Sequence, residues 1–271
     1  MAQREWVPPS VDISVPSMAR TYDYLLGGAH NFAVDRQLAA HVEQVMPDAR
    51  SAARVSRAFL GRVVNFMVGQ GIRQFLDIGS GIPTVSNVHE VAQAAAPECR
   101  VVYVDKDPIA VAHSELLLAD NDRAAIVHGD MRDPDAILGH PETARLLDLD
   151  QPVGLLLLMM LHWLPDDADP WALMARYRAA LAPGSLLAIT HVTADHQDER
   201  LDEVTGLIKE SRSADQLTER SHDQIRALFG DWDPVEPGLV GCSAWRPAGP
   251  GDVADAAEMN MVIHGGVARK P

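Results

Sequence analysis

The chain has 271 residues, 47% of them hydrophobic and 23% charged, so it is long enough to bury a sizeable core as a globular protein. Its formal net charge of −15, with no basic run to offset it, argues against a protein that binds nucleic acid along the phosphates. The two cysteines, Cys99 and Cys242, lie far apart and indicate neither a disulfide framework nor a zinc site.

Residues 1–16 lack a cationic stretch followed by an apolar one, so no secretory signal is expected. The longest apolar run, residues 153–161, is far too short to span a bilayer. We therefore expect a soluble, cytoplasmic protein with no membrane partner, no nucleic-acid partner and no metal ion. These observations leave the oligomeric state open.

The first 70 residues predict an arm followed by helices. Prolines and few apolar residues in residues 1–16 indicate an extended arm. A helical pattern runs from residue 17 to a Gly-Gly pair, and a second helix follows with Asn31 as its N-cap. Apolar residues at spacings of four, four and three then predict a long amphipathic helix over about residues 48–68.

Residues 20–36 gather polar and aromatic side chains around the Gly-Gly pair, among them Tyr22, Tyr24, His30 and Asn31. One interpretation is a lid that closes over bound ligands. The other is a capped helix pair whose polar groups satisfy one another. Residue types alone do not decide between the two.

Residues 74–84 predict a strand, a tight turn and the start of a helix, and the rest of the chain is organised around them. Gly79 and Gly81 permit positive φ and let backbone N–H groups approach a ligand at the start of the following helix. Pro83 stands close to where a third glycine would complete a nucleotide-binding loop. A purely structural turn therefore remains an alternative.

Two further strands end in carboxylates. The apolar run 101–104 is followed by Asp105, and the run 124–128 is followed by Gly129, Asp130 and Met131. In an open parallel sheet the carboxyl ends of the strands are where ligands bind, and an acid after the second strand can accept both ribose hydroxyls. With Asp77 in the first strand, these acids predict an adenosine site.

The remaining pattern alternates helices and strands. Asp-Pro pairs, typical of an N-cap followed by proline at the first helical position, begin three of the helices. The later elements are predicted as helices at 85–95, 108–119 and from 134, a strand at 153–161, a helix from 170, a strand at 185–192, helices at 201–210 and 221–229, a late strand within 235–245 and a last strand at 260–263. This order predicts an α/β doubly wound fold with an antiparallel hairpin at one sheet edge.

These motifs together resemble a class I S-adenosylmethionine-dependent methyltransferase over about residues 70–268. The opening Pro-Ser-x-Ala-Arg-x-Tyr-Asp-Tyr-Leu-Leu-Gly-Gly-x-x-Asn-Phe-x-x-Asp-Arg, from residue 16, resembles the signature of an actinomycete methyltransferase family of uncharacterised function. The resemblance implies a Rossmann-like, mostly parallel seven-stranded sheet. It divides the chain into an N-terminal arm and helical cap, residues 1–69, and a methyltransferase domain, residues 70–271.

The resemblance also implies roles for the polar strand ends, with S-adenosylmethionine as cofactor and S-adenosylhomocysteine as product. Asp77 and the 79–81 backbone would hold the methionine end, Asp105 the ribose diol, and Asp130 the adenine amino group, with Met131 against the ring. The expected cofactor-binding set is Asp77, Gly79, Ser80, Gly81, Asp105, Lys106, Asp130 and Met131. Alternatively, Asp105 and Asp130 only form turns and Met131 belongs to the core.

Methyl transfer to a hydroxyl requires removal of a proton, and His162 is the best candidate for the base. Its surroundings, Leu-His-Trp followed by Pro-Asp-Asp, are similar to a stretch of small-molecule O-methyltransferases in which that histidine is the base. The alternative is a histidine that only packs beside the cofactor. His191, Tyr24 and His30 are weaker candidates, and Trp163 is grouped with the substrate-contacting residues.

Three functions follow from this sequence. A methyltransferase acting on an oxygen or nitrogen of a small-molecule metabolite comes first. A catalytically silent protein with the same fold, binding a ligand for regulation, is the second, because fold alone does not establish catalysis. An NAD-dependent dehydrogenase is the third, although its glycine pattern requires glycine at Thr84.

Overall fold

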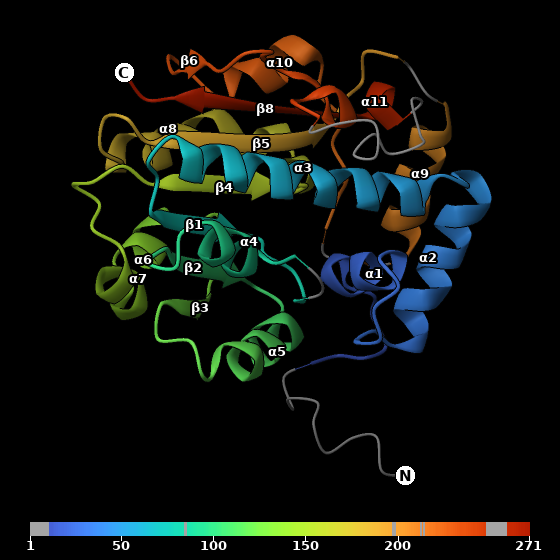
Figure 1. Ribbon diagram of the computed structural model, residues 1–271. Helices are drawn as coiled ribbons and strands as arrows, with labels where there is room; N and C mark the ends of the chain where they lie inside the picture. Colours follow the sequence, from blue (N-terminus) through green and yellow to red (C-terminus); the bar gives the residue numbers. More distant parts are fainter. Residues whose placement is uncertain (1–10, 84–85, 197–198, 212, 214, 248–258) are drawn as a thin grey trace.

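A mixed eight-stranded sheet runs through the protein, with helices on both of its faces (Figure 1). The computed structural model describes residues 11–83, 86–196, 199–211, 213, 215–247 and 259–271. The strand order is β3-β2-β1-β4-β5-β8-β6, and β7 also pairs with β8. The strands are β1 Gln74–Ile78, β2 Arg100–Asp105, β3 Ala124–His128, β4 Gly154–Leu158, β5 Leu186–Val192, β6 Asp233–Pro234, β7 Val240–Gly241 and β8 Ile263–Arg269.

The predicted Rossmann-like fold is confirmed: β1 to β5 are parallel and every pair that includes β8 is antiparallel. The sheet has eight strands instead of seven because two short strands, β6 and β7, pair with β8 at the edge. The helices are α1 Met18–Leu25, α2 Ala33–Val45, α3 Ala49–Gly69, α4 Val88–Ala95, α5 Pro108–Leu118, α6 Pro134–Leu138, α7 Pro141–Leu146, α8 Pro170–Ala180, α9 Glu199–Glu210, α10 His222–Ala227 and α11 Met259–Val262, with 3₁₀ turns η1 Leu161–Trp163, η2 Asp166–Ala168 and η3 Cys242–Ala244.

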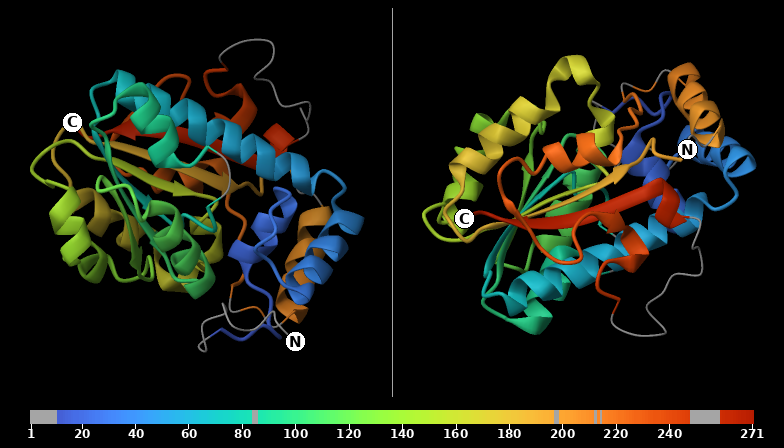
Figure 2. Two further views of the ribbon diagram at one scale, coloured as in Figure 1. Left: turned by 60° about the horizontal axis from the view of Figure 1, so that its bottom comes forward. Right: turned by 90° about the horizontal axis from the view of Figure 1, so that it is seen from above.

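The central strands are apolar on both faces because helices cover both. In β4, Leu156 packs into the cluster under α3 and α4, whereas Leu155 and Leu157 pack into the cluster under α7 and α8. Successive side chains of a strand point to opposite faces, so a continuously apolar run fits a strand buried on both sides. Helices α1, α2 and α9 instead gather beyond one end of the sheet (Figures 1 and 2).

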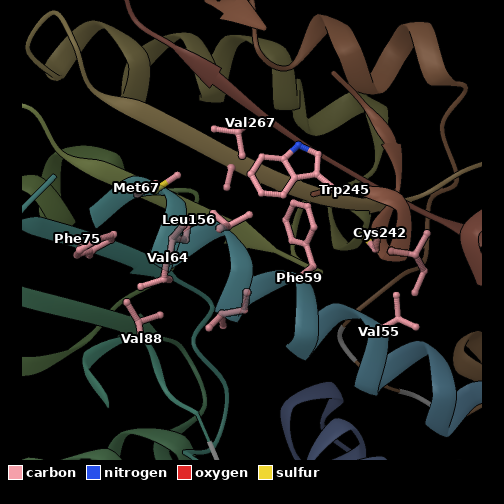
Figure 3. Packing of buried hydrophobic residues seen from close by; sticks show 14 of the residues in the cluster. Val55, Phe59, Val64, Met67, Phe75, Val88, Leu156, Cys242, Trp245 and Val267 are labelled. Carbon is pink, nitrogen blue, oxygen red and sulfur yellow. The ribbon is translucent and has the colours of Figure 1, made fainter. Parts of the chain in front are cut away.

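Helix α3 is anchored to the sheet and to the C-terminal part of the chain (Figure 3). The rings of Phe59 and Phe66 meet the indole of Trp245 edge to face, with centroids 5.4 and 5.6 Å apart. Such pairs contribute about 0.5–1.5 kcal/mol each beyond the area they bury. Arg62 adds hydrogen bonds to the carbonyls of Trp245 and Cys242, at 2.9 and 2.6 Å. The residue-69 boundary between the predicted cap and domain stays a prediction.

A buried polar network joins α1 and α2 to the N-terminus of α5. Arg20 and Asp35 form an almost fully buried ion pair, with Nε and Oδ2 3.0 Å apart. Asp35 also accepts from the backbone N–H groups of Ser17 and Phe32, at 3.0 and 2.8 Å. The Ser17 hydroxyl donates to Asp107 Oδ2 at 2.5 Å, which connects this network to the α5 N-cap. The network fixes α1 at the carboxyl end of β2.

Several predicted boundaries are wrong for physical reasons. The strand expected at 153–161 ends at Leu158, because Met159 takes a positive φ of 58° and turns the chain out of the sheet. The last strand is β8 and not residues 260–263, which lie mainly in α11. A Cβ at Gly265 would lie 2.7 Å from the Phe59 ring, so glycine in β8 allows α3 to pack closely.

The helix caps agree with the predictions in α5, α6 and α8 but not in α2. The N-cap of α2 is Phe32, not Asn31, with Asp35 accepting from its N–H. Helix α7 was not predicted, whereas the aspartate caps of α5, α6 and α8 are confirmed. The predicted arm over residues 1–10 and the start of the helix at 84–85 lie outside the described residues. Within the described part of the chain, no helix has the length and apolarity needed to cross a membrane.

Candidate active site

A cavity of about 490 Å³ opens at the carboxyl ends of β1, β2 and β4. The loops after β1, β2 and β3 form one wall, and α1, α3 and the turn after β4 form the other. All of the predicted cofactor residues line it: Asp77, Gly79, Ser80, Gly81, Asp105, Lys106, Asp130 and Met131. Tyr22, His162 and Trp163 line it as well. The polar strand ends are thus brought together as predicted.

The loop after β1 follows a path that depends on its glycines. Gly79 and Gly81 have φ of 75° and 67°, which disfavours residues with a Cβ. A Cβ at Gly79 would also lie 2.0 Å from the sulfur of Met160. The N–H of Gly79 donates to Val104 O at 2.8 Å, so the loop lies against the end of β2. Pro83 is compatible with this path, although no third glycine is present.

Asp105 is held by the loops on either side of it. Its two carboxylate oxygens accept from the N–H groups of Asp107 and Gly81, at 2.8 and 2.7 Å. Each oxygen still has a lone pair available for a ribose hydroxyl. Burial raises the pKa of Asp105 to about 6, and the two N–H donors oppose that rise. Asp105 is therefore placed in advance for a ligand that donates hydrogen bonds.

Asp77 is buried, and no residue that the structure describes donates a hydrogen bond to its carboxylate. Burial raises its pKa to about 7, Arg57 opposes that rise, and Asp105 adds to it. A cationic group of a ligand placed here would favour the ionised carboxylate. Ser80 Oγ, on the next loop, is also buried without a hydrogen-bond partner among the described residues. Both groups fit a ligand that carries an ammonium and further polar atoms.

The carboxylate that follows β3 is neutralised by a side chain two residues later in the chain. Asp130 forms an ion pair with Arg132, and the hydrogen bond from that side chain lowers the pKa of Asp130. Met131 is nearly buried, and its carbonyl accepts from Tyr177 at 2.8 Å. Lys106 pairs with Asp215 at 2.5 Å, and both line the cavity. This end of the cavity is open to uncharged amino and aromatic groups.

His162 occupies the opposite wall, on turn η1. It is fully buried, and neither ring nitrogen has a hydrogen-bond partner within the described part of the chain. Burial lowers the pKa of His162 well below its usual range, and His191 and Arg220 lower it further. The ring of Trp163 lies 4.7 Å from it, centroid to centroid. A neutral, buried imidazole whose two nitrogens have no partner among the described residues thus lies in the cavity wall.

The lid residues predicted from the sequence separate into two groups. Tyr22 lines the cavity and donates to Ala53 O at 3.1 Å. The others have structural partners and are not among the lining residues that the structure describes: Tyr24 under the guanidinium of Arg50, His30 against His113 with ring centroids 3.9 Å apart and planes tilted by 50°, Asn31 donating to Asp23 at 2.8 Å, and His191 bonded to Arg220 at 2.9 Å. Most of this segment therefore matches the helix-pair interpretation.

Sequence reasoning missed Arg57 and Ser56, which line the cavity from α3. Arg57 lies close enough to act electrostatically on both Asp77 and Tyr22. Its position beside the apolar stripe of α3 is typical of a solvent-exposed arginine, so the sequence carried no signal for it. No cluster of histidine, cysteine or acidic residues that could hold a metal ion occurs among the described residues.

A family model described as S-adenosyl methyltransferase matches residues 4–271. The chain belongs to this S-adenosyl methyltransferase family. Membership gives the class of reaction, methyl transfer from S-adenosylmethionine, and the product S-adenosylhomocysteine. It removes the dehydrogenase alternative.

Two solved structures resemble this family member along nearly the whole chain. A candidate methyltransferase from Thermobifida fusca YX is 40% identical, with a TM-score of 0.91, covering 98% of this chain and 99% of its own. A DUF574 family protein from Streptomyces avermitilis is 35% identical, with a TM-score of 0.91, and the match covers 96% of this chain and 99% of that protein. The plantazolicin methyltransferase shares the fold: it is 10% identical, with a TM-score of 0.54, and the match covers 93% of this chain and 96% of that protein. No curated protein matches the chain.

Proposed function

We propose that this S-adenosylmethionine-dependent methyltransferase methylates an oxygen or nitrogen atom of a small-molecule metabolite, with His162 as the general base. The observation that carries the proposal is the buried His162 ring, whose two nitrogens lack partners among the described residues and which lines the same cavity as the cofactor residues. The cavity, at about 490 Å³, lies within the range of roughly 300–1,000 Å³ that small-molecule pockets occupy.

In this proposal the cofactor lies across the strand ends. Asp105 accepts from the ribose hydroxyls, Asp130 accepts from the adenine amino group, and Met131 packs against the adenine ring. Lys106 borders the same adenosine region. The available lone pairs on Asp105 and its fixed position support the ribose assignment.

The methionine end then lies toward Asp77, Ser80 and α3. Asp77 accepts from the ammonium group, which favours its ionised form, and the 79–81 backbone borders the methionine chain. Arg57 supplies a cation for the carboxylate. The electrostatic pairing of Arg57 with Asp77 supports this orientation, because a zwitterionic ligand end places one charge against each.

When bound, S-adenosylmethionine supplies the methyl group, and its sulfur keeps the electron pair of the breaking C–S bond. His162 accepts the acceptor's proton through one of its unpaired ring nitrogens and later releases it to solvent. Burial keeps this imidazole neutral, so a ring nitrogen can take the proton as the acceptor oxygen or nitrogen bonds to the methyl group.

Tyr22 and Trp163 would contact the acceptor from α1 and η1, on the side of the cavity away from the adenosine residues. Residues 1–69, as proposed, contribute a cap through α1, since Tyr22 and its neighbours line the cavity. A cap of this kind shields the reacting atoms from water.

Calorimetric titration with S-adenosylmethionine, S-adenosylhomocysteine and NAD tests the cofactor site first. Micromolar binding of the first two, with none for NAD, supports the placement. Hydroxylated and amino metabolites are then screened for S-adenosylhomocysteine formation. Binding without turnover of any acceptor would favour the catalytically silent alternative.

A further inference from the structure

Arg220 is a fully buried cation whose side chain reaches the turn that carries His162. Its Nη1 donates to Leu161 O at 2.9 Å, and its Nη2 donates to Leu164 O at 2.6 Å. These two carbonyls stand on either side of His162 in the chain. The neighbouring Thr218 N–H donates to His162 O at 2.8 Å. Residues 218–220 thus hold the backbone of turn η1 at three points.

The same guanidinium has two further partners. Nε and Nη2 donate to Asp166 Oδ1 at 3.1 and 2.8 Å, and Nη1 lies 2.9 Å from His191 Nε2. Five donor contacts therefore use the donor capacity of a group with five N–H bonds. A buried guanidinium is tolerated when its donors are satisfied in this way. Lysine could not replace it, because an ammonium cannot span two separated carbonyls with a planar fork.

The contact with Arg220 also fixes the tautomer of His191. Arginine has no acceptor, so His191 Nε2 must carry a lone pair that accepts from Nη1. The proton of the neutral ring then resides on Nδ1, which donates to Val192 O at 2.6 Å. The ring of His191 lies 5.4 Å from the ring of His162, at 88° to it. Since both nitrogens of His191 are used, it offers no hydrogen bond to His162.

We propose that Arg220 is a positioning residue for His162: it fixes turn η1 and locks His191 as the neutral Nδ1–H tautomer, so that the basic nitrogen of His162 is not engaged by His191 and stays free for the proton of the methyl acceptor. The proposal rests on the proposed base role of His162. Arg220 and His191 do not themselves line the cavity within the described residues, so they act through the turn.

The charged and titratable groups around His162 are consistent with this role. Arg220 and His191 face it from the 218–220 segment and β5, and Asp166 balances the charge of Arg220 from η2. Burial and, less strongly, Arg220 lower the pKa of His191 to about 3, against the opposing effects of its hydrogen bond to Val192 O and of Asp166. His191 therefore stays neutral over the working range of pH, and no second cation approaches His162.

Imidazole ¹⁵N spectra of the protein bound to S-adenosylhomocysteine test the tautomer without any methyl acceptor. In the wild-type protein we expect His191 as the Nδ1–H form, unchanged from pH 5 to 9. In Arg220→Lys we expect a mixed or titrating His191 and a shifted His162. The exposed Arg226→Gln variant is the matched control and should leave both signals unchanged. A wild-type His191 that titrates, or an Arg220→Lys spectrum identical to wild type, would overturn the proposal.

A pair of His191 variants keeps the test decisive if Arg220→Lys does not fold. The glutamine of His191→Gln places an amide oxygen near the position of Nε2 and can accept a hydrogen bond from Arg220, whereas the leucine of His191→Leu cannot. Once an acceptor is known, we expect His191→Gln to retain turnover and His191→Leu to lose about 100-fold, the scale of a displacement near the reacting atoms. Both should bind S-adenosylhomocysteine within about threefold of wild type, since the cofactor contacts are untouched.

Equal turnover of the two His191 variants would refute positioning through this network. Full turnover of His162→Ala would instead refute the base role, whatever the spectra show. The two failures are therefore distinguishable.

Discussion

The two walls of the cavity are organised in opposite ways. On the wall formed by the loops after β1, β2 and β3, which we propose holds the cofactor (the cofactor wall), Asp105 and Asp130 accept hydrogen bonds from neighbours within two residues in the chain, Asp107 and Arg132. On the opposite wall, formed by α1, α3 and the turn after β4 (the acceptor wall), the ring of the buried His162 has no hydrogen bond among the described residues. Its turn is held by Arg220, 58 positions later by number. The carboxylates of one wall are thus held partly by near neighbours, whereas the histidine of the other lies on a turn that a distant residue positions.

The sharpest test of this difference is His162→Ala. Because general-base catalysis typically contributes about 10²–10⁴-fold, we expect turnover to fall by that factor while the affinity for S-adenosylhomocysteine stays within about threefold. Steady-state rates with an identified acceptor measure the turnover, and calorimetry measures the affinity. His41→Ala, an exposed histidine, is the control. Equal losses in turnover and affinity would show that His162 contributes to cofactor binding as much as to catalysis.

The buried ion pair that fixes α1 should be essential to the acceptor wall. Removing one partner of a buried pair leaves the other uncompensated, so Asp35→Ala should lower the free energy of unfolding by about 3–5 kcal/mol. Urea denaturation measures it. Glu115→Ala, on the exposed face of α5, should change it by less than about 0.5 kcal/mol. Stability of Asp35→Ala within 1 kcal/mol of wild type would contradict the role assigned to the Arg20–Asp35 network.

Asp105→Ala should break the cofactor wall selectively. Hydrogen bonds to a charged group are worth about 1.5–3 kcal/mol each, so losing two ribose contacts should weaken S-adenosylhomocysteine binding at least about 100-fold. Calorimetric titration measures the affinity, with the exposed Asp120→Asn as control. Unchanged affinity would mean that the ribose lies elsewhere.

Binding of S-adenosylhomocysteine should strengthen as pH rises. In the free protein, burial raises the pKa of Asp77 to about 7 and of Asp105 to about 6, while the ligand favours both ionised forms. Affinity should therefore fall below pH 7, by up to about tenfold per pH unit for each group, and level off above it. Titrations between pH 5 and 8 measure this. In Asp77→Asn, the dependence near pH 7 should disappear.

In the free protein, Asp77 and Asp105 make the stability of the fold decrease as pH rises, the opposite of the trend in ligand affinity. Their pKa values lie above 3.8, the value in the unfolded chain, so their contribution to stability is fully present below pH 3.8 and is lost as pH rises through about 6 and 7. The free protein should thus lose stability from these two groups between pH 4 and 7, and bound ligand should reduce the loss. Thermal unfolding with and without S-adenosylhomocysteine checks it. The same slope in both would show that the ligand does not contact these carboxylates.

Elements with local causes can be predicted from the amino-acid pattern. Residues 74–81 read as a strand and a glycine turn because apolar residues stop abruptly at Gly79, and Asp-Pro pairs marked three helix starts. Parallel strands place their carboxyl ends on one edge of a sheet. For that reason the amino-acid pattern groups the proposed cofactor residues on one edge of the sheet.

The acceptor wall and the C-terminal strand depend on packing between distant parts of the chain. The end of β4 at Leu158 follows from the positive φ of Met159, which apolar sequence does not reveal. Strand β8 contains Gly265, whose missing Cβ permits close packing of Phe59, although glycine disfavours a strand in isolation. Arg57 and Arg220 reach the site and its supporting turn from α3 and from beyond α9. Such contacts depend on long-range packing, so no short stretch of sequence contains the information that sets them.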